Sequence, residues 1–251
     1  MSENDPIQGV TQRVALVTGG SGGIGSAVVE RLAADGYAIG VHYSGNEVRA
    51  NETVRMVTER GGHAIAVGGD IADDAAMSMA FSAVEEAFGH LDVVVNTAGI
   101  MILSTVAELE LSDLDRMMRT NIRGTFVVSQ LAARRLAPGG AIVNFSTSQT
   151  RLQHPMYAAY AASKAAVESL TLVLARELRG KDVTVNAIAP GPTATKLFLN
   201  GKDEQLIERL ASLSPLERLG TPEDIAEVVT FLAGPARWIN GQVIFPNGAI
   251  A

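Results

Sequence analysis

Short apolar runs alternate with longer amphipathic stretches along the 251-residue chain. The short runs are rich in β-branched residues and apolar on both faces, which is typical of strands that helices cover on both sides. They occupy Val14 to Val17, Ala38 to His42, Ala64 to Gly68, Leu91 to Val95, Ala141 to Phe145, Val183 to Ile188 and Gln242 to Phe245. Strands that alternate with helices pair in parallel through right-handed crossovers. The pattern therefore predicts an α/β fold, with a doubly wound parallel seven-stranded sheet and helices on both faces.

Two helix boundaries follow directly from the residues between these strands. After Gly23 the apolar side chains recur on one helical face, and Gly36 ends that helix before the second strand. Thr221, followed by Pro222 and two acidic residues, is a typical helix start. These signals support the alternation of strands and helices at both ends of the chain.

No internal repeat, low-complexity run or linker divides the sequence, and α/β folds of this length commonly form one domain. We therefore expect residues 12–251 to form a single domain, preceded by a flexible segment of residues 1–11. Residues 191–219 follow the least regular pattern. We expect this stretch to form a mobile lid.

Composition and charge argue against several classes of protein. A net charge of -7 without any run of Lys or Arg argues against a nucleic-acid partner. The absence of cysteine excludes disulfides and thiolate metal sites. The N-terminal stretch lacks the features of a secretory signal and no apolar run has the length of a membrane helix, so we expect no membrane partner and a cytoplasmic location. The four histidines lack metal-binding spacing, so no metal is expected, and each is assigned to a surface or loop position: His42, His63, His90 and His154.

A glycine-rich turn follows the first strand and leads directly into an amphipathic helix. Glycines in such a turn let backbone N–H groups at a helix N-terminus approach a pyrophosphate. A glycine cluster alone is weak evidence, because ordinary strand-to-helix turns also use glycine. The turn has the sequence Thr18-Gly19-Gly20-Ser21-Gly22-Gly23-Ile24-Gly25, in which Gly19, Ser21, Gly23, Ile24 and Gly25 are candidate cofactor-binding residues.

The spacing of Thr18, Gly19, Gly23 and Gly25 resembles the TGxxxGxG turn of the short-chain dehydrogenase/reductase family, and matching segments recur in the family's order up to the last strand. The similarity extends to 3-oxoacyl-(acyl-carrier-protein) reductase-like and glucose dehydrogenase-like members. It implies a Rossmann-like fold and a nicotinamide dinucleotide cofactor. The further cofactor contacts that it implies are Asp70 and Ile71 at the adenine, Asn96, Ala98 and Gly99 in a segment similar to the family's NNAG (here with Thr97 in place of the second asparagine), and Pro190, Gly191, Thr193 and Thr195 at the nicotinamide carboxamide.

The choice between the two dinucleotides depends on the residues that follow the second strand. An NAD enzyme usually places an acid about 20 residues after the first glycine, where it would repel a 2′-phosphate. Here that place holds His42-Tyr43-Ser44-Gly45, without an acid. Tyr43 and Ser44 are therefore candidate ligands of a 2′-phosphate, although neither carries charge, and Gly22 stands where some relatives have an arginine. The sequence predicts NADP(H).

Tyr160 and Lys164 stand four residues apart in Tyr160-Ala161-Ala162-Ser163-Lys164, so on a helix both lie on one face. A nearby ammonium and the positive charge of an oxidised nicotinamide both favour the phenolate of a tyrosine. Such a tyrosine can relay a proton to or from a substrate oxygen while hydride moves to or from the cofactor. YxxxK alone is common by chance, but this pair follows a matching glycine turn at the family's distance. Both residues are candidate catalytic and cofactor-binding residues.

The family places a serine hydroxyl 13 residues before this tyrosine, where the present chain has Thr147. Thr147 keeps a hydroxyl donor. Side chains alternate across a strand, so a shift of one residue would bring Ser146 or Ser148 to the site instead. We take Thr147 as the first candidate and Ser148 as the second. The resemblance also implies a catalytic role for Asn121, which in relatives helps to hold a water chain to the lysine.

The sequence defines the reaction better than the substrate. Apolar residues in Gln149 to Tyr157 and in Pro192 to Leu213 favour a small ketone, aldehyde or β-ketoacyl substrate, while Arg151 leaves recognition of an anion open. Three alternatives remain: an NAD-dependent alcohol or sugar dehydrogenase, an isomerase or dehydratase of the same fold, and a catalytically silent dinucleotide-binding protein. The resemblance implies a homotetramer or homodimer, in which helices over Leu109 to Ala137 and Tyr157 to Arg179 make one contact.

Overall fold

Seven apolar segments pair side by side into one sheet in the computed structural model, which describes residues 12–251. The strands are β1 (Val14–Thr18), β2 (Ala38–Tyr43), β3 (Ala64–Gly68), β4 (Val93–Asn96), β5 (Ala141–Phe145), β6 (Thr184–Ile188) and β7 (Val243–Ile244). Their order is β3-β2-β1-β4-β5-β6-β7, and every pairing is parallel. The order reverses between β1 and β4, where α/β sheets bind ligands beyond the carboxyl ends of their strands. The predicted fold class is confirmed.

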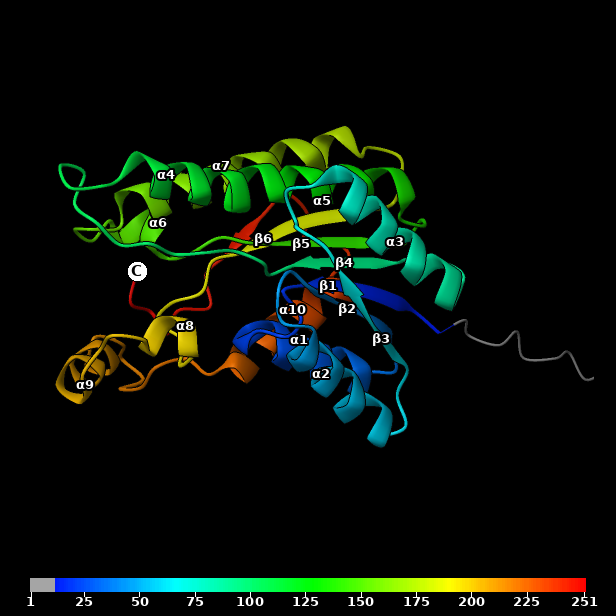
Figure 1. Ribbon diagram of the computed structural model, residues 1–251, viewed down its shortest axis with the longest axis horizontal. Helices are drawn as coiled ribbons and strands as arrows, with labels where there is room; N and C mark the ends of the chain where they lie inside the picture. The colour runs from blue at the N-terminus through cyan, green and yellow to red at the C-terminus, as the bar shows by residue number, and fades with distance from the viewer. Residues whose placement is uncertain (1–11) are drawn as a thin grey trace, which may run out of the picture.

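Helices cover both faces of the sheet (Figure 1). Neighbouring residues of β1 face opposite cores, because side chains alternate along a strand: Val17 belongs to one apolar cluster and Leu16 to the other. The first cluster joins the sheet to α1 (Gly23–Ala34), α2 (Glu47–Glu59) and α10 (Pro222–Ala233), and the second joins it to α3 (Asp74–Phe88), α5 (Gly124–Arg135) and α7 (Ala158–Glu177). The two cores hold the strand ends in fixed positions.

The predicted helix over Leu109 to Ala137 is interrupted in its middle. It begins as α4 (Leu111–Met117), widens into a π-helical segment over Met118–Arg123 and continues as α5. A π-helical turn contains an extra residue and is frequent at functional sites. Hydrophobic periodicity does not reveal such an insertion, because the apolar face continues on both sides of it. The wide turn contains Asn121, which is fully buried.

The stretch 191–219 has more regular structure than its sequence pattern predicted. It contains α8 (Lys196–Leu199) and α9 (Glu204–Ser212), and the side chains of Thr195 and Asp203 cap these helices. Both helices lie beyond the carboxyl ends of the strands, across from α6 (Gln149–Leu152) (Figure 1). The mobility of this lid stays a prediction.

The flexible segment predicted for residues 1–11 lies outside the described residues. Among the described residues, no helix combines the length and apolar character needed to cross a membrane. Near the C-terminus, Gly248 accepts a hydrogen bond from Ser214, which belongs to the stretch 191–219.

Candidate active site

The glycine turn between β1 and α1 is a tight backbone cradle. Gly19 has a φ of +64°, which a residue with a side chain rarely adopts. A Cβ on Gly25 would collide with the carbonyl oxygen of Gly19, and a Cβ on Gly23 would lie 3.0 Å from the side chain of Thr195. The turn therefore brings bare backbone to the N-terminus of α1. This arrangement fits a pyrophosphate, and Ser21 and Ile24 lie in the same turn.

The ends of β1 and β4 are joined beneath this turn. The hydroxyl of Thr18 donates to Asn96 at 2.7 Å, and the hydroxyl of Thr97 donates to the backbone of Thr18 at 2.5 Å. Thr97 thus ties the two strands together although it replaces an asparagine of the family pattern. The side-chain amide of Asn96 is buried and its nitrogen has no partner among the described residues. An unpaired buried donor at this edge fits a cofactor that supplies an acceptor.

His42 corrects the assignment of all four histidines to surface or loop positions. It is 1% exposed, near the end of β2, where it joins the glycine turn to the loop after β3. Its Nδ1 accepts from the backbone N–H of Gly19 at 3.4 Å, and its Nε2 lies 3.1 Å from the carbonyl oxygen of Gly69. Burial lowers the pKa of His42 to about 4, so the ring is neutral at physiological pH. Neither of these two backbone partners could be identified from the sequence around His42.

The two adenine candidates after β3 are held in different ways. Asp70 accepts hydrogen bonds from the backbone of Ala72 at 2.9 Å and from Arg119 at 2.6 Å, and both partners hold the pKa of its carboxyl below the usual range. Ile71 is only 3% exposed and packs against Gly124, where a Cβ would lie 2.7 Å from it. These contacts attach the loop after β3 to the π-helical segment and to the start of α5.

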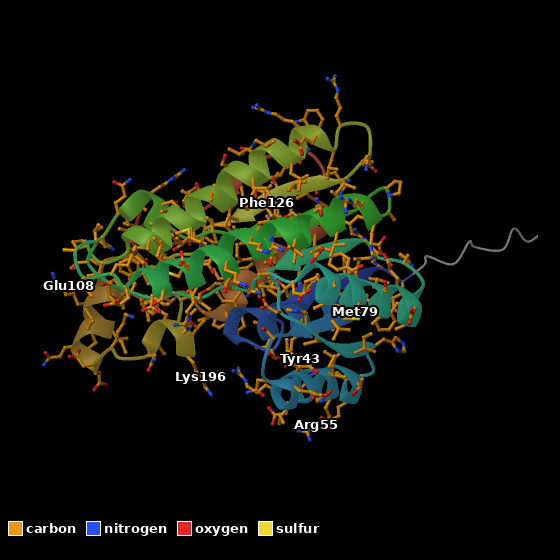
Figure 2. The ribbon with its side chains drawn as sticks, turned by 45° about the horizontal axis from the view of Figure 1, so that its top comes forward. Tyr43, Arg55, Met79, Glu108, Phe126 and Lys196 are labelled. Atoms are coloured by element: carbon orange, nitrogen blue, oxygen red, sulfur yellow. The ribbon has the colours of Figure 1, made fainter. Side chains whose placement is uncertain are left out.

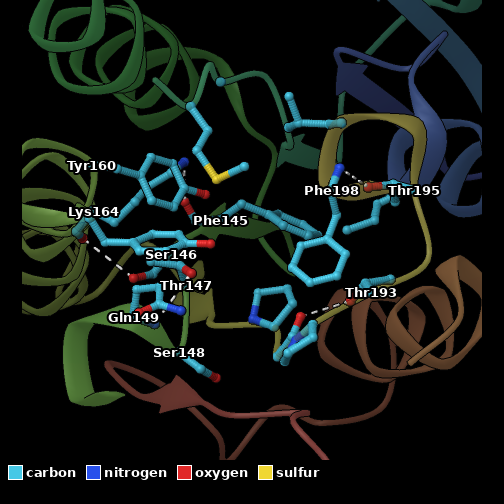
Figure 3. Close-up of a pocket in the computed structure, with 18 of the residues that line it drawn as sticks. Phe145, Ser146, Thr147, Ser148, Gln149, Tyr160, Lys164, Thr193, Thr195 and Phe198 are labelled. Atoms are coloured by element: carbon cyan, nitrogen blue, oxygen red, sulfur yellow. Dashed lines mark hydrogen bonds between the residues drawn. The ribbon is translucent and has the colours of Figure 1, made fainter. Parts of the chain in front are cut away.

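Tyr160 and Lys164 project from α7 toward the same pocket (Figure 3). The ammonium of Lys164 donates to the carbonyl oxygen of Phe145 at 2.8 Å and lies 6.0 Å from the centre of the Tyr160 ring. Burial raises the pKa of Tyr160 to about 12, with the neighbouring Thr147 hydroxyl acting in the opposite direction, and burial lowers the pKa of Lys164 to about 8. The predicted effect of the ammonium and of an oxidised nicotinamide on the pKa of this phenol stays a prediction.

The three adjacent hydroxyls at the end of β5 have different partners. Ser146 donates to Glu168 at 2.6 Å, and Ser148 donates to the backbone of Ala189 at 2.9 Å. Thr147 instead lines the pocket beside Tyr160, whose pKa it lowers, and its oxygen accepts from the backbone of Gln149 at 3.3 Å. Among the three hydroxyls, that of Thr147 alone donates to no described residue, so its proton is available in the pocket. This geometry favours Thr147, the first candidate from the sequence, over Ser148.

Asn121 lies behind the lysine in the wide helical turn. Its side-chain oxygen accepts from the backbone N–H of Ile100 at 2.9 Å, and its nitrogen donates to the carbonyl of Ile100 and to the hydroxyl of Ser163. A Cβ on Gly99 would lie 3.2 Å from both Asn121 and Lys164, so glycine permits this close approach. Asn121 is therefore fully engaged in joining the loop after β4 to α7.

The pocket in front of Tyr160 is mostly apolar (Figure 3). On the lid side, the hydroxyl of Thr193 donates to the carbonyl of Gly191 at 2.9 Å, and Pro190 and Thr195 complete that wall. Arg151 does not line the pocket, because its guanidinium lies 3.5 Å above the centre of the Phe245 ring. The apolar lining consists of Ile24, Ile100, Met101, Phe145, Leu152, Leu197 and Phe198, among others.

The fold and the site define a dinucleotide-binding α/β protein with a hydroxyl, a tyrosine and a lysine at one pocket. Within residues 12–251 no group of three His, Asp or Glu side chains could hold a metal ion. The cradle, the unpaired Asn96 amide and the open pocket fit a nicotinamide dinucleotide, with the pyrophosphate at the Gly19 turn and the nicotinamide toward Tyr160.

Comparisons with known proteins agree with this definition. A family model described as enoyl-(acyl carrier protein) reductase matches residues 19–248. A short-chain type dehydrogenase/reductase of Picea abies is 40% identical, with 94% of this chain and 91% of that protein covered. An NADPH-dependent aldehyde reductase-like chloroplastic protein of Arabidopsis thaliana is 39% identical, with 94% and 93% covered. A short chain dehydrogenase of Burkholderia cenocepacia J2315 in complex with NADP has a TM-score of 0.89 and 39% identity, with 96% and 98% covered. The chain belongs to the short-chain dehydrogenase/reductase family.

Proposed function

We propose that this protein is an NADP(H)-dependent oxidoreductase that transfers a hydride between the nicotinamide and a carbonyl or secondary alcohol. The observation that carries the proposal is the shared pocket of Thr147, Tyr160 and Lys164 beside the glycine cradle. Two relatives support the cofactor, since one is named an NADPH-dependent reductase and the other was solved with NADP.

Each side chain of the pocket has a separate role in this reaction. The bound cofactor supplies the hydride. Tyr160 donates a proton to the carbonyl oxygen, and its high pKa keeps that proton in place at neutral pH until the oxygen acquires charge. Thr147 holds the same oxygen by a hydrogen bond. Lys164 brings a positive charge behind the tyrosine. Asn121 fixes the loop after β4, whose Gly99 lies against the ammonium of Lys164.

The lining of the pocket favours an uncharged substrate. Its walls are largely aliphatic and aromatic, and Arg151 is stacked on Phe245 instead of facing the pocket. Among the described residues that line the pocket, Lys164 is the one cation, and its ammonium already donates to Phe145. The substrate class is therefore an apolar ketone or aldehyde.

The function is tested with purified protein, NADPH and a panel of apolar and anionic ketones and aldehydes, followed by the absorbance of the reduced nicotinamide. Oxidation of NADPH that depends on an apolar carbonyl is the expected result. Tight NADPH binding without turnover of any panel member would instead favour a dinucleotide-binding protein without catalysis. Preferential turnover of anionic members would contradict the substrate class.

The preference for NADP(H) needs a cation that the sequence analysis did not identify. The residues after β2 bring no positive charge, because Tyr43 lies near the carboxylate of Glu47 and Ser44 is an exposed neutral side chain. Arg49, in the first turn of α2, lines a hollow together with Ser21 of the glycine turn, and no ion pair in the described residues includes it. Arg49 thus lies where a 2′-phosphate between α2 and the turn would gain a positive charge. The sequence did not reveal Arg49, because a cation on α2 has no fixed sequence spacing from the glycine turn.

Arg49→Gln is expected to raise the dissociation constant for NADPH by about tenfold, the loss of one exposed charge-assisted contact, and to leave that for NADH unchanged. Titration of both cofactors by their fluorescence measures the two constants. Arg55→Gln is the matched control, because Arg55 lines the same hollow but pairs with Glu59. A native protein that binds NADH as tightly as NADPH would contradict the NADP(H) preference itself.

We further propose that the protein is a homotetramer or homodimer that uses α5 and α7. Phe126 on α5 is 51% exposed (Figure 2), and Leu172 and Val173 on α7 are 40% and 50% exposed. Ala162 and Ala165 are also exposed on α7, and small residues let two helices approach closely. Light scattering at micromolar concentration should give a mass above that of one chain, and a monomer mass would refute the assembly.

The single-domain organisation and the cytoplasmic location predicted from the sequence stay predictions.

A further inference from the structure

A carboxylate behind the pocket is bound to the loop that carries Thr147. Glu168 lies one helical turn after Lys164 on α7 and is partly buried. Its Oε1 accepts a hydrogen bond from the hydroxyl of Ser146 at 2.6 Å and another from the hydroxyl of Thr150 at 2.8 Å. One carboxylate oxygen therefore binds two points of the segment that follows β5.

These two points flank the candidate catalytic hydroxyl. Ser146 directly follows β5, and Thr150 lies in the first turn of α6. The hydroxyl of Thr150 also lies 2.9 Å from the carbonyl oxygen of Thr147. Beyond Thr147, Ser148 donates to Ala189 and lies 3.3 Å from the side-chain amide of Asn247. Each of these neighbouring hydroxyls thus donates to a partner of its own.

We infer that Glu168 is a positioning residue that keeps the Thr147 hydroxyl in register with Tyr160. The inference rests on the proposed function. Because Tyr160, Lys164 and Glu168 are on one helix, attachment of the loop to Glu168 fixes Thr147 relative to the other two groups of the reaction. Side chains alternate along an extended segment, so a slip of one residue would replace Thr147 by a neighbouring serine. The two bonds to Glu168 oppose that slip.

Glu168 acts through the loop and not on the substrate. It does not line the pocket, and its hydrogen-bond partners in the described residues are Ser146 and Thr150. The carboxylate is also not among the groups that shift the pKa of Tyr160 or of Lys164. Loss of the side chain should therefore change the geometry of carbonyl reduction and leave cofactor binding unchanged.

The test compares Glu168→Ala with Glu168→Gln in the full-length protein. Alanine removes both bonds, whereas the amide oxygen of glutamine can still accept from both hydroxyls. We expect Glu168→Ala to lower kcat for an apolar ketone by about 30-fold, since misplacement of a reacting group by about 1 Å costs on the order of 100-fold. Glu168→Gln should retain activity within about threefold, and the dissociation constant for NADPH should be unchanged in both. Glu177→Ala, at the exposed end of the same helix, is the control for loss of a carboxylate.

A double-mutant cycle with Thr147→Ala separates positioning from general damage to the fold. If Glu168 acts through Thr147, then Glu168→Ala should cost little further activity once the Thr147 hydroxyl is gone. Multiplicative losses, a weakened affinity for NADPH, or full activity in Glu168→Ala would each overturn the inference. Absence of carbonyl turnover in the unsubstituted protein would reject the proposed function and the positioning role with it, whereas turnover that is insensitive to Glu168 rejects only the latter.

Discussion

Tyr160→Phe is expected to lower kcat for carbonyl reduction by about 1,000-fold, within the range that a general acid contributes. The substitution removes one oxygen and keeps the ring, so the packing of Tyr160 against the pocket is retained. The carbonyl oxygen then loses its proton donor at the moment when it becomes negative. Steady-state rates with saturating NADPH and an apolar ketone give the size of the loss.

The binding constant for NADPH distinguishes loss of chemistry from loss of the site. The cofactor contacts that we propose from the Gly19 turn, Asn96 and Lys164 remain in Tyr160→Phe, so affinity for NADPH should change by less than about twofold, which is a small fraction of a hydrogen bond. Lys164→Met is the companion variant, since it removes the ammonium next to Tyr160 and leaves the phenol. Turnover that survives in Tyr160→Phe would refute the assignment of the proton donor.

The sequence predicted the fold because each of its signals is local. β-branched apolar runs define buried parallel strands, and the β4 and β7 strands differ from their predicted ranges by only one or two residues at each end. The glycine turn and the spacing of Tyr160 and Lys164 are equally local, since each lies within a single turn or helix. For this reason the two sides of the pocket could be identified separately from the sequence. One side is the glycine turn, and the other carries Tyr160 and Lys164.

Other features of the site depend on contacts between segments far apart in the chain. His42 gains its role from Gly19 and Gly69, which reach it only when the strands pair. Glu168 is one of many acids on predicted helices, and nothing in its own segment distinguishes it. Burial raises the pKa of Tyr160, and the sequence does not reveal this effect, because it supplies the neighbouring Lys164 but not the depth of burial. Burial and pairing across strands are properties of the folded chain.

The choice among the three adjacent hydroxyls shows this limit most clearly. Alternation along a strand left Ser146, Thr147 and Ser148 as candidates, because a change of one residue in register exchanges them. Their hydrogen bonds distinguish them in the fold. Ser146 and Ser148 donate to Glu168 and Ala189, whereas Thr147 donates to no described residue and lines the pocket beside Tyr160.

Thr147→Ala is accordingly expected to lower kcat by about 100-fold, the typical cost of removing one donor to an oxygen that becomes charged. Thr147→Ser should recover activity to within about tenfold, because the hydroxyl is kept and only the methyl group that restricts its rotation is lost. Ser146→Ala and Ser148→Ala should each lower kcat by about fivefold, the equivalent of one ordinary hydrogen bond lost from the loop. Parallel kinetics of the four variants give the order of effects.

A larger loss in Ser148→Ala than in Thr147→Ala would reverse the assignment and make Ser148 the catalytic hydroxyl. The same kinetics test whether threonine is suited to this position. Its β-branched side chain has fewer favourable rotamers than serine, so the hydroxyl is held more firmly toward Tyr160 once the backbone is fixed. Thr147→Ser should then show its loss mainly in kcat, with KM for the ketone little changed, because the hydroxyl stabilises the oxygen more strongly in the transition state than in the bound substrate.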